Sequence, residues 1–430
     1  MTRNRELGTG NRLHYAWIVI GVIFLALLAG MGVRSNFGVY IKPLEAEFTT
    51  TREPVSRINF LSLLVFAFMQ PVIGALVDRF GPRPVLAGSM LLAGLGTIGM
   101  SYAPSLFWVG CLYMLVGGIA SGGAAQTAAT SVATRWFATS RGLAMGIAGA
   151  GSSTGQLIFF PLATWLLLKT DWRFSYLLQG IFMAGIMFPI VAWLGRSDPK
   201  DMGLEPYGAG EVAAGGGAPG LAGMAGERRV TLAEAARSRD FWLLAMGFFV
   251  CGYTSTGVIQ FHFIPYALDH GFHQMQAANA LGMMGALNIV GTMLSGRICD
   301  AVGNRIPLSV VYAFRALAIL FLLFVREGVM LTVWAMAFGL TYIASVPPTS
   351  GLTADLFGKL SVGKLFGWIF LSHQVGAALG SWIGGALYDR TGNYVGVFLS
   401  AAALAFVASA LSYAIRESPR LPAPLPAAAA

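Results

Sequence analysis

Twelve apolar runs, each long enough to cross a lipid bilayer, follow one another along the 430 residues of the chain. A transmembrane helix needs about 20 mostly apolar residues, and a backbone that faces lipid must satisfy its own hydrogen bonds, so each run predicts a helix. The predicted spans are 15–41, 54–77, 84–103, 107–134, 142–168, 174–195, 241–268, 275–299, 307–325, 329–354, 365–388 and 394–415. We therefore predict an all-α membrane protein with twelve transmembrane helices.

One long polar stretch, residues 196–239, divides the spans into two sets of six. Its middle, from Gly208 to Gly226, is mostly glycine and alanine and cannot bury a core, so we expect it to be disordered. The stretch ends at Thr231-Leu-Ala-Glu234, a capping-box spacing that predicts a short helix before the seventh span. The expected domains are an N-terminal six-helix bundle (1–195), a cytoplasmic linker (196–239), a C-terminal six-helix bundle (240–417) and a cytoplasmic tail (418–430).

The composition excludes a water-soluble protein. Hydrophobic residues make up 56% of the chain and charged residues only 11%, whereas soluble domains have roughly 25% charged residues. No metal-ligand cluster, nucleotide-binding loop or nucleophile–base pair is visible, so we expect neither a cofactor nor an enzymatic activity. The three cysteines, Cys111, Cys251 and Cys299, lie in or beside apolar runs and are interpreted as buried thiols.

The net charge of +9 is explained by its distribution along the chain. If the N-terminus is cytoplasmic, 19 of the 28 lysines and arginines fall in loops on the inner side and 7 on the outer side. Inner loops of membrane proteins carry such an excess. We therefore expect a multi-pass protein of a bacterial inner (plasma) membrane, with both termini cytoplasmic. The positive charge is an orientation signal and not a nucleic-acid-binding surface.

A ten-residue pattern, G-x-x-x-D-x-x-G-x-R, occurs after the second span and again after the eighth, 222 residues later. A repeat at matching positions in two halves is how secondary transporters are built. Its glycines permit a tight turn, and its aspartate can pair with an arginine or a helix N-terminus, so the two loops could latch the halves together. The predicted gating residues are Gly74, Asp78, Arg79, Gly81 and Arg83 in the first copy, and Gly296, Asp300, Gly303 and Arg305 in the second.

This repeat resembles the loop signature of the major facilitator superfamily. Within it, the stretches Arg135–Gly151, Gly385–Tyr394 and Phe37–Phe48 resemble the monocarboxylate transporters and the oxalate/formate antiporters. The resemblance implies two pseudo-symmetric six-helix bundles, a central site near mid-membrane and alternating access. The chain departs from the monocarboxylate family in span 8, where Asn288 and Thr292 stand in place of an Asp and Arg pair.

Arg34, in the outer part of span 1, is the leading candidate for the substrate contact. A charge inside the membrane is costly and usually faces a cavity, and a guanidinium fits a carboxylate with two parallel hydrogen bonds. The position also falls near a lysine that the monocarboxylate family uses in this span. Snorkelling to the outer headgroups, or capping of backbone carbonyls, remains the alternative. Arg315 in span 9 is expected to snorkel or to form a structural pair.

His373, in the middle of span 11, is the second candidate. A histidine could bind an anion when protonated and release it when neutral, and the oxalate antiporters carry a lysine in this helix. Its alternative is a hydrogen-bonded packing residue, and His262 in span 7 is a weaker candidate. Uncharged residues that could line the site, or else join helices, are Gln126, Gln156, Asn288 and Tyr342.

The function that these features predict is transport of a small organic anion, a monocarboxylate, by proton symport or by anion exchange. No aspartate or glutamate lies deep in a span, which argues against a drug/proton antiporter. The alternative is an exporter of hydrophobic or drug-like solutes. The expected partners are the anion, protons and membrane lipid, but no nucleic acid, and we expect the protein to act as a monomer.

Overall fold

The computed structural model describes residues 14–123, 126–209, 230–358 and 361–417. Within these ranges the chain is helical and contains no β-strand. Eleven helical stretches are long and apolar enough to cross a membrane. The remaining predicted span, α19 (Val362–Thr391), is long enough but carries Ser372, His373 and Gln374 in its middle. The predicted all-α membrane fold is confirmed.

The N-terminal half begins at Tyr15 and ends at Leu194. Its helices are α1 (Tyr15–Ser35), η1 (Asn36–Tyr40), α2 (Ile41–Glu47), α3 (Arg52–Phe80), α4 (Pro82–Ser101), α5 (Leu106–Tyr113), η2 (Met114–Ala120), α6 (Ser121–Gly123), α7 (Gln126–Trp136), α8 (Arg141–Lys169), α9 (Trp172–Ile181), η3 (Phe182–Met187) and α10 (Phe188–Leu194). These segments correspond to the first six predicted spans.

The C-terminal half begins at Arg239, after two short helices, η4 (Pro199–Met202) and α12 (Leu232–Ala235). Its helices are α13 (Arg239–Cys251), η6 (Gly252–Gln260), α14 (Phe261–Asp269), α15 (Gln274–Val302), α16 (Arg305–Leu322), α17 (Gly328–Thr341), α18 (Val346–Phe357), α19 and α20 (Val395–Tyr413). They correspond to the last six predicted spans.

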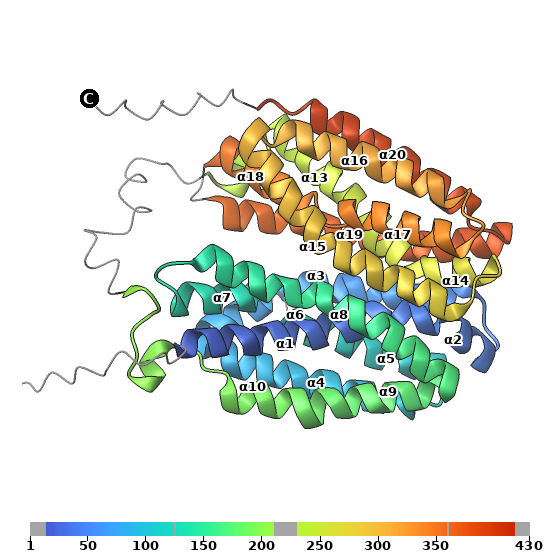
Figure 1. The fold of residues 1–430 in the computed structure, drawn as a ribbon, viewed down its shortest axis with the longest axis horizontal. Coiled ribbons are helices and arrows are strands. Elements are labelled where there is room, and N and C mark those ends of the chain that lie inside the picture. The colour runs from blue at the N-terminus through green and yellow to red at the C-terminus, as the bar shows by residue number, and fades with distance from the viewer. Residues whose placement is uncertain (1–13, 124–125, 210–229, 359–360, 418–430) are drawn as a thin grey trace, which may run out of the picture.

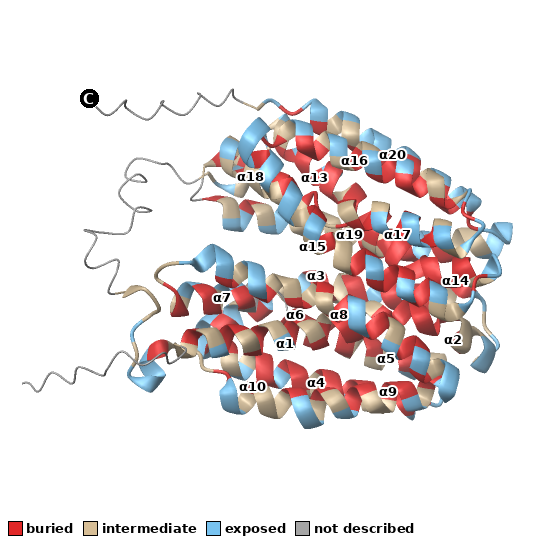
Figure 2. Cartoon of the chain, in the orientation of Figure 1, coloured by how far each residue is buried: buried red, intermediate tan, exposed pale blue. Residues whose placement is uncertain are grey.

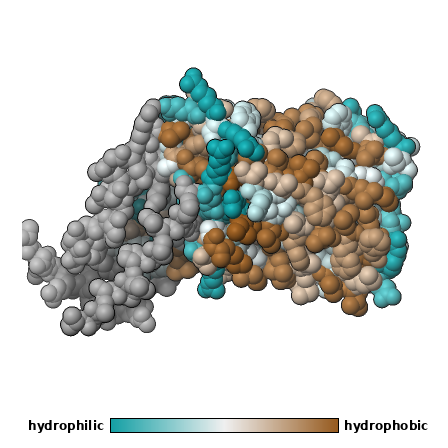
Figure 3. Space-filling view, turned by 90° about the horizontal axis from the view of Figure 1, so that it is seen from above, coloured by the Kyte–Doolittle hydropathy of each residue, from teal (hydrophilic) through white to brown (hydrophobic). Residues whose placement is uncertain are grey.

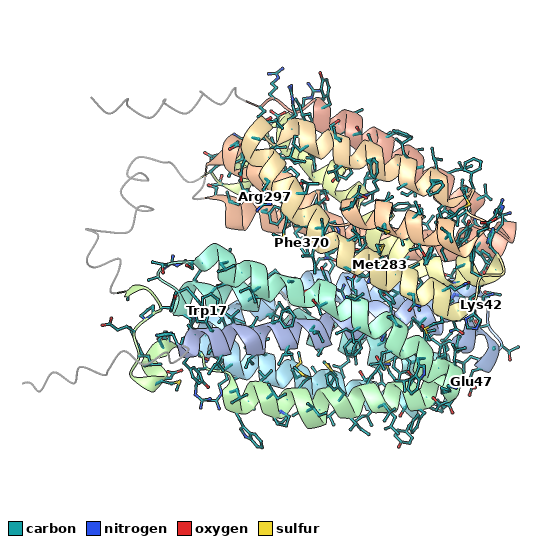
Figure 4. The ribbon with its side chains drawn as sticks, in the orientation of Figure 1. Trp17, Lys42, Glu47, Met283, Arg297 and Phe370 are labelled. Atoms are coloured by element: carbon teal, nitrogen blue, oxygen red, sulfur yellow. The ribbon has the colours of Figure 1, made fainter. Side chains whose placement is uncertain are left out.

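The two halves lie side by side as two bundles (Figure 1). We call the end at which α1 and α13 begin the linker end, and the end that contains α2 and α14 the far end. The bundles meet along the far end, and their ribbons diverge toward the linker end (Figure 1). In Figure 4, Lys42 and Glu47 mark the far end, whereas Trp17 and Arg297 lie on different bundles toward the linker end.

Several spans change helix type partway along. Span 7 widens into the π-helix η6, and span 10 breaks at residues 342–345 between α17 and α18. Irregular backbone at membrane depth is tolerated where it is buried in protein or lines a cavity. Pro347 lies at the start of α18, where a missing N–H costs nothing. These two irregular segments both reach the centre of the molecule.

Small residues let certain helices approach closely. A side chain at Gly380 of α19 would meet the backbone of Tyr253 at 2.6 Å, and side chains at Gly151 and Gly155 of α8 would meet the backbone of α1. Gly142 and Gly146 of α8, although spaced in the same way, are exposed and face open space near the linker end.

The buried residues gather inside each bundle and along the contact between the bundles, and the exposed ones lie around the outside (Figure 2). Much of that outside is apolar, as expected of a surface in contact with lipid. On the outer face of the C-terminal half, apolar side chains form a broad band that ends in hydrophilic residues at the far end (Figure 3). Val310 and Leu317 of α16, and Phe324 just after it, are exposed apolar residues of this half.

The linker is ordered where it leaves and rejoins the bundles. Tyr207 donates its N–H to the Trp136 carbonyl (2.8 Å) and its own carbonyl accepts from Ala138 (2.9 Å), so residues 196–209 are held against the N-terminal half. Thr231 and Glu234 form the predicted capping box of α12. The predicted disorder between Gly208 and Gly226, and the tail 418–430, lie almost entirely outside the described residues.

Candidate functional site

A cavity of about 140 Å³ lies between the two halves, at the level where η1, η6 and the break in span 10 meet. One ordered water needs a cavity of roughly 10–15 Å³, so this cavity could hold several waters or a small organic molecule. The polar residues that line it are Arg34, Ser35, Asn59, Gln156, Ser255, Thr256, Gln260, Tyr342, His373 and Gln374. Among the described lining residues there is no aspartate or glutamate.

Arg34 reaches this cavity from the end of α1, with its Cζ atom 3.9 Å from the centroid of the Phe66 ring. The first apolar helical stretch runs from Tyr15 to Glu47. Arg34 therefore lies near the middle of this stretch, whereas the sequence predicts a position in the outer part of the span. The Nη1 atom of Arg34 also lies 4.0 Å from Met31 Sδ, a weak hydrogen-bond acceptor. Within the described ranges no carboxylate lies within 4 Å of the guanidinium.

His373 lines the opposite wall of the cavity, on α19. Its ring stacks on Phe370 (centroids 5.6 Å apart, planes 7° apart) and lies 4.9 Å from the Phe248 ring. Its Nδ1 atom is buried and has no hydrogen-bond partner among the described residues. Two aromatic contacts thus hold the imidazole in place while one nitrogen stays available. Phe370 points from α19 toward the N-terminal half (Figure 4).

Two glutamines, one from each half, have unpartnered polar atoms at the cavity. Gln156 of α8 and Gln374 of α19 are 5% and 4% exposed, and the Oε1 atom of each has no partner in the described part of the chain. Buried polar atoms are normally hydrogen-bonded, so two unpartnered amide oxygens at one cavity make it the candidate ligand site. The sequence predicts Gln156 as a site residue but not Gln374. In that helix the neighbouring His373 is chosen instead, because a histidine can carry a positive charge.

Tyr342 lines the cavity as predicted, and it lies at the start of the break in span 10. Its hydroxyl donates to Oε1 of Gln260 on η6. The buried Arg315 donates to the carbonyls of Thr341 and Tyr342, the latter at 3.1 Å. Arg315 has no exposed surface, so the expectation of snorkelling is wrong; its partners are these two carbonyls, and it forms no ion pair among the described residues.

Asn288 does not line the cavity. It contacts the broken backbone of span 10 instead. Its Oδ1 accepts from the Ile343 N–H (3.0 Å), and its Nδ2 donates to Ser153 Oγ (2.9 Å) on α8. Asn288 therefore joins the two halves and fixes the backbone beside Tyr342. The side chain of Gln126 lies outside the described residues.

The two repeated loops have the same geometry. Gly81 (φ +82°) ends α3 and Gly303 (φ +89°) ends α15, each in a backbone conformation that favours glycine. In the first loop, the Arg83 N–H donates to Ser197 Oγ (3.3 Å) and its Nε to the Ala192 carbonyl (3.0 Å). In the second, Glu417 accepts from the N–H groups of Asn304 (2.6 Å) and Arg305 (3.1 Å).

These contacts show that a polar residue beyond the last helix of each half caps the turn of that half's repeat. The sequence pattern alone did not indicate Ser197 or Glu417, because each cap comes from more than 100 residues away. Asp78 and Arg79 of the first copy, and Asp300 of the second, are exposed at the linker end.

A cluster of charges joins the halves at the far end, and sequence reasoning did not identify it. Arg52, only 4% exposed, pairs with Glu45 (2.8 Å) and with Asp269 (3.0 Å), and Lys42 pairs with the same Asp269. The Arg52 guanidinium also lies 3.8 Å from the centroid of the Tyr388 ring.

The start of α3 docks on the C-terminal half through the same cluster. The backbone N–H groups of Arg52 and Glu53 both donate to the Asp389 carboxylate (3.0 and 2.8 Å), and Trp382 donates to Glu53 (2.6 Å). We call Glu45, Arg52, Asp269 and Asp389 the far-end cluster. It closes the far end of the molecule.

The chain was compared with known protein families and solved structures. Residues 22–346 match the model of the Major Facilitator Superfamily. Among solved structures, a bacterial homologue of the human lysosomal transporter Spinster, inward-facing and occupied, has a TM-score of 0.72 and 14% sequence identity. The match covers 94% of this chain and 97% of that one.

Curated relatives align along almost the whole chain. The MFS-type transporter YcxA of Bacillus subtilis (strain 168) is 25% identical, covering 88% of this chain and 90% of the relative. Monocarboxylate transporter 13 of Bos taurus is 28% identical (92% and 88%). The oxalate:formate antiporter of Oxalobacter formigenes is 26% identical (94% and 91%).

Proposed function

Because the chain belongs to the Major Facilitator Superfamily, we propose that it carries a small organic anion, a monocarboxylate, across the membrane by alternating access. That the protein is a transporter follows from the family and from relatives that are transporters. The anion as substrate is the proposal. It is supported by the nature of the cavity and by the names of two relatives, a monocarboxylate transporter and an oxalate:formate antiporter.

The observation that carries the proposal is the cation in the cavity. Arg34 lies against the Phe66 ring and has no carboxylate partner in the described structure. An uncompensated charge inside a membrane protein is costly, whereas a bound carboxylate would neutralise it and accept two parallel N–H bonds. Arg34 is therefore assigned as the anion anchor.

His373, Gln156 and Gln374 provide the rest of the proposed binding site. Gln156 belongs to the same half as Arg34, and the other two belong to the opposite half. A substrate held by both halves favours closure of the cavity around it, which is what alternating access requires. His373 is assigned as the pH-sensitive contact, with proton symport or anion exchange as the coupling.

The linker end is assigned to the cytoplasm of a bacterium, because the excess of lysines and arginines lies in the loops on that side. With this orientation the far-end cluster closes the outer side. We keep 1–195 and 240–417 as the two transport bundles, 196–239 as the linker and 418–430 as the tail, in a protein that acts as a monomer. The repeated loops, with Asp78 and Asp300, are assigned as inner latches.

Export of hydrophobic or drug-like solutes is the second candidate. The observation in its favour is that Phe37, Leu63, Phe248 and Phe370 also line the cavity. Under this alternative, Arg34 would have a structural role and its replacement would change transport little.

Uptake of labelled lactate or pyruvate into proteoliposomes tests the proposal. Wild type would be compared with Arg34→Gln, which keeps a polar side chain but removes the charge, with and without an inward proton gradient. Losing a hydrogen bond to a charged group costs about 1.5–3 kcal/mol, so we expect uptake to fall by at least tenfold. Arg57→Gln is the matched control, because Arg57 is 58% exposed at the far end.

The outcomes separate the candidates. Uptake that follows the proton gradient supports symport, and uptake that requires internal carboxylate supports exchange. If no carboxylate is carried in either format, or if Arg34→Gln carries it as well as the wild type does, the anion proposal fails and export of hydrophobic solutes takes its place.

A further inference from the structure

His262 of α14 is a buried histidine that the proposed transport site does not use. Its side chain has no exposed surface, and both ring nitrogens are hydrogen-bonded. Nε2 lies 2.7 Å from the Ser381 carbonyl of α19, and Nδ1 lies 3.0 Å from the Tyr394 hydroxyl. The ring fits against Gly384, where any side chain would come within 2.5 Å of Nε2.

The hydrogen bonds around His262 define its protonation state. The Ser381 carbonyl can only accept, so Nε2 carries a proton. The Tyr394 oxygen accepts from Nη1 of Arg52 (3.1 Å), and an arginine can only donate. Donation of the Tyr394 hydroxyl proton to Nδ1 of His262 completes the set of bonds, and it requires Nδ1 to be unprotonated. The neutral imidazole satisfies every group in this chain of hydrogen bonds.

This chain connects His262 directly to the far-end cluster. Arg52, which donates to Tyr394, is the same residue that pairs with Glu45 and Asp269. Arg52 belongs to the N-terminal half, whereas Tyr394 and His262 belong to the C-terminal half. The bond from Arg52 to Tyr394 is thus one of the contacts that hold the far end closed.

A proton on Nδ1 would break this arrangement. Nδ1–H would face the Tyr394 oxygen, whose own proton would lose its acceptor in a buried site. A second positive charge would also be placed beside the Arg52 guanidinium. The titratable and charged groups around His262 are Arg52 of α3, Lys42 and Glu45 of α2, Tyr266, Asp269 and His270 of α14 and its end, Tyr388 and Asp389 of α19, and Tyr394.

The carboxylates in this group are already engaged. Glu45 and Asp269 pair with Arg52, and Asp389 accepts from the backbone at the start of α3. A charged imidazole could recruit one of them only by taking it from the contacts that close the far end. Protonation and closure therefore compete.

We propose that His262 is a proton-binding site that controls the far-end gate: the neutral imidazole holds the gate closed, and protonation opens it. Protons on the far side would shift the transporter toward the state that is open to that side. The inference rests on alternating access, which the proposed function shares, and not on the identity of the substrate.

The distance between the two halves at the far end can be followed by pulsed electron spin resonance, without any substrate. Spin labels would be placed at Ala46 of α2 and Arg390 of α19, both exposed, in a chain whose three cysteines are replaced by alanine. The pH would be lowered from about 7.5 to about 5.5, which spans the range in which a histidine changes charge. One linked proton can raise the open-to-closed ratio by up to about tenfold per pH unit.

The same replacement, histidine by glutamine, is made at two positions to test the role of His262. In His262→Gln, we expect the distance distribution to lose its dependence on pH. In His270→Gln, which alters an exposed histidine of the same segment, the wild-type response should remain. Tyr394→Phe, which removes the hydroxyl between His262 and Arg52, should also abolish the response and serves if His262→Gln does not fold.

A pH response that survives in both His262→Gln and Tyr394→Phe would overturn the proposal. A wild type whose far end stays equally closed from pH 7.5 to 5.5 would overturn it as well. Neither result bears on whether a carboxylate is carried, so this inference and the proposed function fail separately.

Discussion

The central cavity and the far-end cluster each contain one arginine, and the two arginines differ in whether carboxylates neutralise their charge. Arg34 lies over an aromatic ring in a cavity with no carboxylate among its described lining residues. Arg52 lies over Tyr388 but also pairs with Glu45 and Asp269 and donates to Tyr394. Both side chains stack on a ring, and among the described residues only Arg52 has its charge neutralised by carboxylates.

The difference separates a charge kept for a ligand from a charge used for closure. A paired arginine stabilises the contact between the halves and has little left to offer a substrate. An arginine without a carboxylate partner is retained at a cost in stability, which a bound anion can offset. Replacement of Arg52 should therefore change the conformation and stability of the protein, and replacement of Arg34 should change its transport.

The largest effect is expected from Arg52→Leu. The substitution leaves Glu45 without its cation and Asp269 with Lys42 alone, and breaking a largely buried ion pair typically costs about 3–5 kcal/mol. We expect a clear decrease in the melting temperature of the purified protein in detergent. Arg57→Leu, an exposed neighbour on the same helix, should melt close to the wild type. Equal melting temperatures for the two variants would show that Arg52 does not close the far end.

Arg34→Lys is expected to have the next largest effect, and on transport alone. Lysine keeps the charge but loses the planar fork that holds a carboxylate with two bonds. Carboxylate uptake should fall by about tenfold, with the melting temperature unchanged. If the uptake stays at the wild-type level, the two-bond anchor is wrong; if the protein melts much earlier, Arg34 belongs with Arg52 as a structural residue.

Replacement of the cavity glutamines should have a smaller effect, on transport for Gln374 and on stability for Gln260. Gln374 has an unpartnered Oε1, whereas the Oε1 of Gln260 accepts from Tyr342. Since an amide oxygen cannot donate, Gln374 would contact a carboxylate by turning its amide so that Nε2 donates. One hydrogen bond contributes about 1 kcal/mol, so Gln374→Leu should raise the substrate concentration for half-maximal uptake by roughly fivefold without loss of stability. Gln260→Leu should instead lower the melting temperature. Equal behaviour of the two variants would remove Gln374 from the site.

The smallest effect is expected outside both regions, at the repeated turn. Gly303 has φ +89°, and a side chain there would also meet the Glu417 carboxylate at 2.9 Å. A non-glycine residue in the left-handed region costs roughly 1–2 kcal/mol, so Gly303→Ala should lower the melting temperature by a few degrees. Gly296→Ala, at a helical position with open space around it, should be neutral. A neutral Gly303→Ala would show that the turn relaxes.

Much of the fold could be predicted from the sequence because the bilayer restricts the options. Twelve apolar runs in lipid must be helices, and two copies of one loop pattern in register imply two similar halves. Helix breaks were harder to place. Pro347 and Pro348 lie just after the break in span 10 at residues 342–345, whereas the π-helix in span 7 has no comparable signal in the sequence.

The candidate site was predicted in part. Arg34, His373, Gln156 and Tyr342 all line one cavity, because a polar residue inside an apolar span is conspicuous in the sequence. Asn288 was equally conspicuous, but it points to Ser153 and the broken backbone instead. Gln374 was passed over, since its unpartnered state exists only once its neighbours are in place.

The sequence by itself determined the helices, the repeat and the presence of cations inside the membrane, since hydrophobicity and charge act locally along the chain. Only the tertiary structure decided which cation is neutralised. Arg52 meets Asp269 and Tyr394 across more than 200 residues, and its neutrality depends on the two halves lying together at the far end. Ion pairs act between atoms a few ångströms apart, and only folding brings such distant residues to that distance.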